Sequence, residues 1–178
     1  MSEELYKEEN PQGLGDKIPD RKRILKEVSD KSFARIFLRE ANPDIQDDKE
    51  IVMATVKSNP SALQFASDRL RSDKEVVLTA IRADADMTMP EGGVLSYASD
   101  GLRNDKEIVL EAVKNNGMAI QYMSEELVND KNFVLKALKN SGPYTFKVPY
   151  SFMWKLNKIH KIWDNDKVPG SDVKRCRS

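Results

Sequence analysis

The 178-residue chain has little of what disulfide-bonded, membrane-spanning and most catalytic proteins require. It contains one cysteine and one histidine, and only 7% of its residues are aromatic. The single cysteine, Cys176, cannot form an internal disulfide, which favours the cytoplasm or another reducing compartment. No apolar run approaches the roughly 18 residues of a membrane span, and the acidic N-terminal stretch lacks the apolar segment of a secretory signal.

An excess of charge of one sign is also missing. Lysine plus arginine and aspartate plus glutamate both number 29, so no overall field favours nucleic acid or an anionic membrane. The charges are nevertheless uneven, because residues 143–178 carry 8 basic and 3 acidic side chains, leaving the rest of the chain net acidic. We expect a protein partner, and a nucleic-acid contact through this basic tail is the weaker alternative.

The motifs of common catalytic sites are absent as well. The sequence has no phosphate-binding loop, no dinucleotide fingerprint and no nucleophile elbow. His160 and Cys176 together supply too few ligands for a structural zinc site, which needs four. The stretch that starts at Asp84 resembles the beginning of a calcium loop, but Met89 stands where that loop needs glycine. We therefore expect no enzyme activity, no cofactor, no metal and no small-molecule substrate.

What the chain does have is an internal repeat, which decides the architecture before any single residue is considered. One segment reads DDKEIVMATVKSN from Asp47 and returns from Ser72, Asn104 and Asn129. A second reads ALQFASDRLRS from Ala62 and returns from Val94 and Ala119. The two segments alternate along the chain, as expected for a tandem array of one small unit.

The repeat period is constant with one exception. The spacing from Asp48 to Asp73 equals that from Asp105 to Asp130, whereas the spacing from Asp73 to Asp105 is longer. The additional residues lie within 84–93, which we interpret as an extended loop. A fainter unit precedes the first clear one. The predicted organisation is an acidic, flexible N-terminus at 1–17, repeats at 18–142 (units near 20–47, 48–72, 73–104, 105–129 and 130–142), and a connector, capping helix and basic tail at 143–178.

Each unit is predicted to contain two helices. The first helix has a start signal, with the N-cap candidates Asp47, Ser72 and Asn104 followed three residues later by Glu50, Glu75 and Glu107, the spacing of a capping box. Its apolar positions cover two sides, with Leu110 opposite Ala112, so neighbours are expected on both sides. The second, shorter helix has an aromatic anchor and then a serine that can cap a turn. These residues are Phe65, Tyr97 and Tyr122, and Ser67, Ser99 and Ser124.

The recurring pattern ALQ[FY]AS, followed by a leucine and then DKE[IV]V, resembles the tandem helical repeat family catalogued as domain of unknown function 4116. The resemblance covers roughly residues 47–142 and recurs in register. It implies an all-α fold, which agrees with our expectation of stacked two-helix units in an α-solenoid-like domain closed by a C-terminal helix. It assigns no catalytic or binding residues. The insertion and the tail depart from the pattern, so individual function is expected there.

The tail contains one predicted helix, beginning at Ser151, with two different faces. We expect Phe152, Leu156, Ile159 and Trp163 to cover the apolar side of the last repeat, because terminal repeats need a cap. The alternatives are that this helix binds a partner or that it lies on a membrane surface. The opposite face carries Trp154, Lys158 and Lys161, an aromatic and cationic group that suits an interface with an acidic protein.

These observations predict a non-enzymatic protein–protein interaction module or adaptor. The alternative is an accessory structural subunit of a large assembly. The candidate partner-binding residues are Trp154, Lys158 and Lys161 in the tail, and Met87 and Met89 in the insertion, where flexible thioethers can adapt to a partner.

Overall fold

The computed structural model describes residues 21–84, 93–141 and 150–161. The described chain is all-α, and no strand occurs in these three ranges. The first part comprises α2 (Arg21–Glu27), α3 (Lys31–Glu40), α4 (Pro43–Gln46), α5 (Lys49–Ser58), the 3₁₀ helix η1 (Pro60–Phe65), α6 (Asp68–Arg71) and α7 (Lys74–Ala83). The second part comprises η3 (Val94–Tyr97), α8 (Asp100–Arg103), α9 (Lys106–Asn115), η4 (Gly117–Tyr122), α10 (Glu125–Asn129) and α11 (Lys131–Asn140), and the third is α12 (Tyr150–His160).

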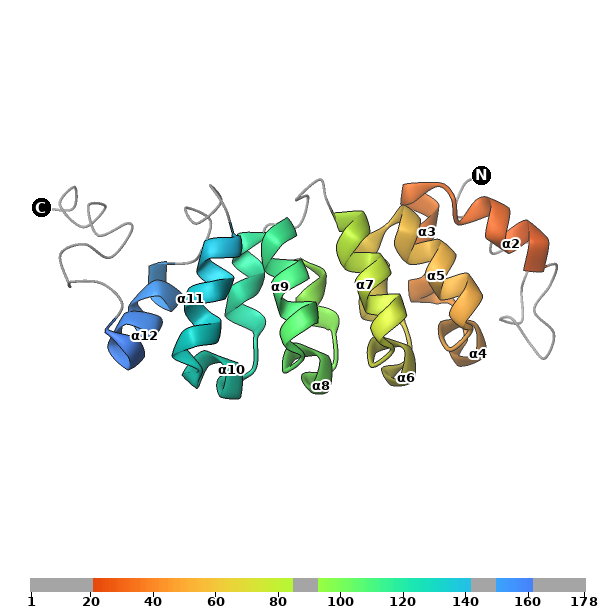
Figure 1. Cartoon of the computed structure of the whole chain (residues 1–178). Coiled ribbons are helices and arrows are strands. Elements are labelled where there is room, and N and C mark those ends of the chain that lie inside the picture. Colours follow the sequence, from red (N-terminus) through yellow and green to blue (C-terminus); the bar gives the residue numbers. More distant parts are fainter. Residues whose placement is uncertain (1–20, 85–92, 142–149, 162–178) are drawn as a thin grey trace, which may run out of the picture.

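The helices form one row in the order of the sequence (Figure 1). The long helices α5, α7, α9 and α11 pack side by side, each against the next, and the short segments between them lie behind and below. Among the described elements, α5, α7 and α9 are each followed by a 3₁₀ helix and a short α-helix, and the next described element after α11 is α12. The repeat in the sequence therefore appears as a repeat of packed helices.

The second segment of each unit is not one helix, as the sequence predicted, but two. The chain is extended at Ala66, Ala98 and Met123, and this residue separates a 3₁₀ turn from a short α-helix. The serine that follows starts the short helix. The hydroxyls of Ser67 and Ser124 accept the backbone N–H of Leu70 and Leu127, whereas Ser99 makes no such bond. The serines are thus caps, but of a new helix.

The long helices begin one residue later than predicted. Their N-caps are Asp48, Asp73, Asp105 and Asp130 rather than Asp47, Ser72 and Asn104. In α9 the Asp105 carboxylate accepts the N–H groups of Glu107 and Ile108, at 2.8 and 3.2 Å. The glutamate therefore stands at the second helical position, where it cannot form a capping box, which needs the third. The capping-box prediction is wrong, and the aspartate after it supplies the cap.

The buried sides of α5, α7 and α9 are filled by small and β-branched residues, whereas α11 also buries Phe133 and Leu138. Ile108, Val109 and Val113 have no exposed surface, and Ala112 is 4% exposed. Leu110, predicted to be sandwiched between units, is half-buried at the edge of the core, as are Met53 and Leu78 at the same position. The core is thus continuous from unit to unit, and its outer margin is a row of half-buried side chains.

Neighbouring units are also joined by backbone hydrogen bonds at one repeated position. The N–H groups of Ser67, Ser99 and Ser124 donate to the carbonyl oxygens of Gln46, Arg71 and Arg103 in the preceding unit, at 2.9, 3.1 and 3.0 Å. Residues Asp47 and Asn104, predicted as caps, instead accept the hydroxyls of Ser67 and Ser124 across the same junction. Each junction is therefore fixed in register by the same polar contact.

Candidate interaction surface on the C-terminal helix

The C-terminal helix α12 starts where the short helix of a further unit would start. Tyr150 lies one repeat period after Glu125, the first residue of α10. In the preceding units the short helix ends within a few residues and an aspartate caps the next long helix. The residue in register with Asp130 is Lys155, which lies inside α12. Because lysine cannot accept the backbone N–H groups that an N-cap must satisfy, the helix continues through this position.

The inner side of α12 is held by apolar contacts with the end of the row. Phe152, Met153 and Leu156 are buried, with 8%, 1% and no exposed surface, and α12 packs against α10. The prediction that Phe152 and Leu156 cover the last repeat agrees with this placement. Ile159 was assigned to the same face, but it is exposed, and His160 takes its place on the buried side. Trp163 lies outside the described residues.

His160 completes the junction in place of a backbone group. Its Nε2 lies 2.5 Å from the carbonyl oxygen of Val128 and donates to it. In register, this carbonyl corresponds to those of Gln46, Arg71 and Arg103, whose donors are the serine N–H groups. The residue that would donate here is Pro149, one repeat period after Ser124, and proline has no N–H. The imidazole therefore supplies the donor that the proline removes.

An ion pair attaches the middle of α12 to the same neighbour. Lys155 Nζ lies 2.6 Å from Glu125 Oε1 on α10, and the lysine also lies 6.0 Å from the ring centre of Phe152. Both charged side chains are largely exposed, so the pair contributes little to stability and mainly orients the helix.

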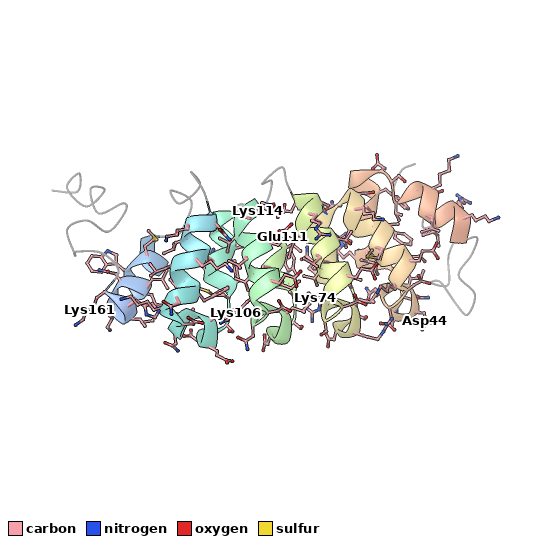
Figure 2. The ribbon with its side chains drawn as sticks, viewed as in Figure 1. Asp44, Lys74, Lys106, Glu111, Lys114 and Lys161 are labelled. Carbon is pink, nitrogen blue, oxygen red and sulfur yellow. The ribbon has the colours of Figure 1, made fainter. Side chains whose placement is uncertain are left out.

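The outer side of α12 carries the predicted interface residues and one more. Lys158 and Lys161 are exposed, and Trp154 is half-buried rather than free on the surface. Ile159, beside Lys158, has 41% of its surface exposed and is the one exposed large apolar side chain among the described residues. The outer surface of α12 consists of Trp154, Lys158 and Ile159 together with Lys161, the residue that follows the helix. Figure 2 shows Lys161 at the opposite end of the row from Asp44.

No acidic residue balances this surface within its own segment of the sequence. Residues 131–163 contain seven lysines and neither aspartate nor glutamate. Of the described residues, the carboxylate that reaches α12 is Glu125, which is taken by Lys155. The outer surface of α12 therefore combines cations with an exposed isoleucine.

Along the rest of the row, lysines and carboxylates alternate in a ladder. The lysines that follow the capping aspartates of α5, α7 and α9 reach the next unit. Lys49 contacts Asp73 and Glu75 at 2.8 and 2.7 Å, Lys74 contacts Asp105 and Glu107 at 3.0 and 2.8 Å, and Lys106 contacts Asp130 at 2.7 Å. Figure 2 shows Lys74 and Lys106 at matching heights on α7 and α9. The DKE motif is therefore a contact between units as well as a helix start.

The ladder shifts the titration of its members. Burial raises the pKa of Asp105, but the Lys74 ammonium and the N–H groups of Ile108 and Glu107 outweigh it, so this pKa lies below its ordinary value. The hydrogen bonds of Lys74 to Glu107 and Asp105 raise the pKa of that lysine. Both groups therefore remain charged across the neutral range.

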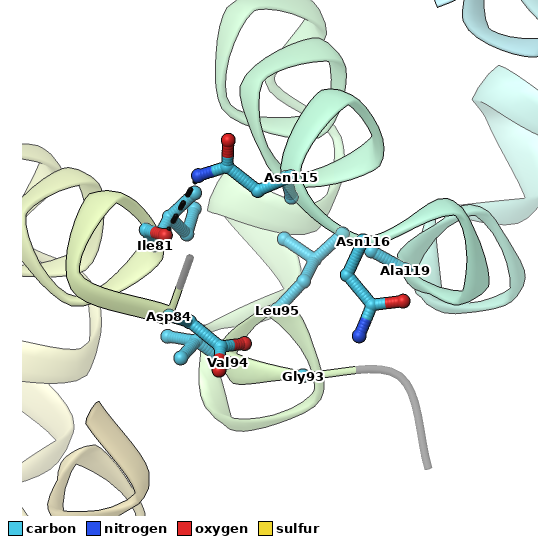
Figure 3. Close-up of a pocket in the computed structure, with 9 residues that line it drawn as sticks. Ile81, Asp84, Gly93, Val94, Leu95, Asn115, Asn116 and Ala119 are labelled. Atoms are coloured by element: carbon cyan, nitrogen blue, oxygen red, sulfur yellow. Dashed lines mark hydrogen bonds between the residues drawn. The ribbon is translucent and has the colours of Figure 1, made fainter. Parts of the chain in front are cut away.

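The insertion begins and ends at a small cavity between α7 and α9 (Figure 3). Asp84, Gly93 and Asn116 line it, and its volume of about 10 Å³ is room for roughly one water molecule. Gly93 has φ +69°, and a Cβ there would lie 2.7 Å from the Asp84 carboxylate, so the closing residue must be glycine. Met87 and Met89 lie outside the described residues, and their predicted role in binding stays a prediction.

Two further features concern the described part of the chain: groups of metal-ligating side chains and the length and apolarity of its helices. No group of three or more His, Cys, Asp or Glu side chains there is arranged to hold a metal ion. None of the helices in the described ranges has the length and apolarity to cross a membrane.

Comparison with protein families gives a repeated match. The family model described as Domain of unknown function (DUF4116) matches residues 48–89, 91–128 and 105–152, which together cover more than half of the chain. The chain belongs to this family. The third match ends inside α12, which agrees with the register of that helix with the DUF4116 repeats. No curated protein and no solved structure matches the chain.

The sequence placed Lys158 and Lys161 on the exposed side of the tail helix, as the structure does, but two features were missed. A helical wheel of the whole tail placed Ile159 inside, because the wheel could not show that His160 is buried instead and donates a hydrogen bond to the Val128 carbonyl. The ladder was also missed, although the lysine of each DKE motif was a signal for it. Once the units are known to stack in parallel, a lysine one repeat away from an aspartate predicts an ion pair between neighbouring units.

Proposed function

We propose that this member of the DUF4116 family is a non-enzymatic interaction module that binds an acidic protein through the outer surface of α12. The observation that carries the proposal is the exposed Ile159 among lysines, in a segment without acidic residues. An apolar residue surrounded by cations gives both buried area and charge complementarity to an acidic surface.

Further support comes from the way α12 is held. Its inner side is fixed by Phe152, Leu156 and His160, so the outer surface is presented on an ordered helix. A preordered surface loses less conformational entropy on binding than a segment that must fold first. Such a module could act as an adaptor or as an accessory subunit of an assembly. The two differ in that an adaptor exchanges its partner and a subunit does not.

The test compares charge reversal on α12 with a matched reversal elsewhere. The variant is Lys158→Glu with Lys161→Glu, and the control is Lys57→Glu with Lys114→Glu, which reverses two exposed lysines on α5 and α9. Both variants should keep the native melting temperature. Affinity purification with mass spectrometry, after nuclease treatment, should lose the partner with the α12 variant alone.

Three results would contradict the proposal: equal loss with the control, full recovery with the α12 variant, or loss after nuclease treatment alone. Binding should also weaken with added salt, because exposed charges are screened over about 8–10 Å at physiological ionic strength. Trp154 is left intact in this design because it is half-buried, so its removal would change stability as well as binding.

A further inference from the structure

The charged ladder along the row stops at a lysine that has no carboxylate partner in the described part of the chain. Lys131 is the first residue of α11 and corresponds to Lys49, Lys74 and Lys106. It is exposed, and among the described residues no carboxylate lies within ion-pair distance of it. In each earlier junction the equivalent lysine contacts the capping aspartate of the next long helix. The position of Lys131 in the ladder therefore lacks its carboxylate.

A further unit in register would not supply the missing carboxylate. The residue one repeat period after Asp130 is Lys155, and the residue one repeat period after Asn132 is Asn157. The place of the aspartate is thus taken by a cation, and the place of the glutamate by a neutral side chain. Since α12 packs against α10, it continues the layer of short helices rather than that of the long ones.

The apolar margin of α11 points to the same open side. Met53, Leu78 and Leu110 are half-buried and pack against the hydrophobic core. Leu135, at the same position of α11, is half-buried, but within the described ranges it is not among the side chains packed against that core. Lys131 and Leu135 are one helical turn apart, so they lie on one side of α11.

We infer that the side of α11 formed by Lys131 and Leu135 receives a helix of another protein whose first turn carries Asp-x-Glu. The aspartate would cap that helix and, with the glutamate, bind the Lys131 ammonium, as Asp73 with Glu75 and Asp105 with Glu107 bind Lys49 and Lys74. The first apolar turn of the incoming helix would cover Leu135. Exposed ion pairs add little affinity, so the lysine sets the register and polarity of the contact.

This surface is distinct from the outer surface of α12, and the inference stands without the proposed function. The probe is a synthetic peptide with residues 104–117 of this chain, which contains Asp105 and Glu107. A staple joins positions 110 and 114 of the peptide. These positions lie on the same side of the helix as Lys106, which faces α11 in the protein, so the staple leaves free the side that faces Lys74. The staple keeps the isolated helix formed, and circular dichroism verifies this before use.

Binding is measured with the full chain by fluorescence anisotropy and by amide chemical shifts. The native chain should bind the peptide with shifts centred on residues 131–139. Lys131→Glu should weaken binding by about tenfold or more, whereas the control Lys57→Glu should leave it unchanged. A Glu107→Lys peptide should bind the native chain poorly and regain affinity for the Lys131→Glu chain, since the charge pair is then reversed rather than lost.

Several outcomes would overturn the inference. Absence of binding by the helical peptide would do so, as would equal binding to the Lys131→Glu chain. Loss with Lys158→Glu and Lys161→Glu but not with Lys131→Glu would place the peptide on α12, leaving the proposed function intact. Binding only after Asp164→Asn and Asp166→Asn would mean that the tail of the chain itself occupies the surface.

Discussion

The internal junctions and the C-terminal junction solve one packing problem with different atoms. Inside the row, a serine N–H donates to a carbonyl of the preceding unit, and an aspartate starts the next long helix. At the C-terminal end, the residues in register with this serine and this aspartate are Pro149 and Lys155, which have neither the N–H donor nor the carboxylate. His160 supplies the missing donor, and Glu125 pairs with the unexpected lysine.

The difference teaches that the repeat can be ended by substitutions within its own register. Without an aspartate cap at the position of Lys155, α12 continues beyond the length of the other short helices, and its additional turns bring His160 to the Val128 carbonyl. The terminal unit therefore keeps the apolar contacts of the repeat but exposes a helix side that internal units lack. This is the side that carries Lys158, Ile159 and Lys161.

The largest expected effect comes from removing a core side chain at each kind of junction. Leu156→Ala in α12 and Ile108→Ala in α9 both remove fully buried groups, and each should cost about 2–5 kcal/mol of unfolding free energy. Urea unfolding measures that cost. Hydrogen exchange should show lost protection confined to α12 for Leu156→Ala but spread over α7, α9 and α11 for Ile108→Ala. Equal spreading in both variants would mean that α12 is an ordinary unit of the core.

The next effect concerns the replacement of the serine donor by His160. His160→Ala leaves the buried Val128 carbonyl without its donor, and this should cost about 1–3 kcal/mol. His160→Gln keeps an N–H donor and should recover part of the loss. Adding Pro149→Ala to His160→Ala restores a backbone N–H at the register position and should also recover stability in urea unfolding. No recovery in either variant would show that the imidazole acts through packing alone.

The sequence was sufficient for the architecture because the repeat and its helical periodicity are local signals. The all-α fold, the packing of long helices against neighbours and the terminal helix follow from positions such as Ile108, Val109 and Leu156. The predicted N-caps lie one residue too early, because two polar residues stand side by side at each helix start. Asp47 and Asp48, for example, are both good N-cap residues. Only the three-dimensional junction shows that Asp47 is engaged by Ser67 of the next unit.

The candidate surface was less predictable, because its boundary depends on contacts between distant residues. Periodicity assigns Lys158 outward, but the position of Ile159 is decided by the hydrogen bond of His160 to Val128, which lies far away in the sequence. The missing carboxylate partner of Lys131 could likewise be recognised only from the ion pairs of the equivalent lysines. The binding roles of Trp154, Lys158 and Lys161, and those of Met87 and Met89, stay predictions.

A smaller effect should separate the two roles of the capping aspartate. Asp105→Ala removes both the cap and the contact with Lys74, and it should cost about 0.5–2 kcal/mol. Asp105→Asn keeps an acceptor for the helix start and loses the charge alone, so it should cost less. Thermal unfolding of the two variants gives the difference. An equal cost for both would mean that the charge, rather than the cap, is the important property.

The same pair predicts the dependence on pH. Because the pKa of Asp105 is lowered in the folded protein, its contribution is present above the unfolded-state pKa of about 3.9 and is lost as the pH falls through the folded value. The native protein should lose stability below about pH 4, and Asp105→Asn should lose less over that range. Identical slopes for the two proteins would refute a charge-based role for Asp105.

The smallest effect is expected from making the unit at 73–104, called here the second, resemble the unit at 105–129, called the third. Deleting residues 85–91 and changing Asp84→Asn gives Asn-Gly at the end of α7, the pair formed by Asn116 and Gly117 after α9, and restores the repeat period of the other units. In the third unit Asn116 starts η4 by accepting the N–H of Met118, so the shortened chain has a working template for the same turn. Closure entropy varies slowly with loop length, so the shortened protein should unfold within about 0.5 kcal/mol of the native one. Urea unfolding provides the measurement, and the variant with the deletion but with Asp84 retained is the control. A large loss in both variants would show that the insertion is a packed part of the repeat and that the second and third units are not interchangeable.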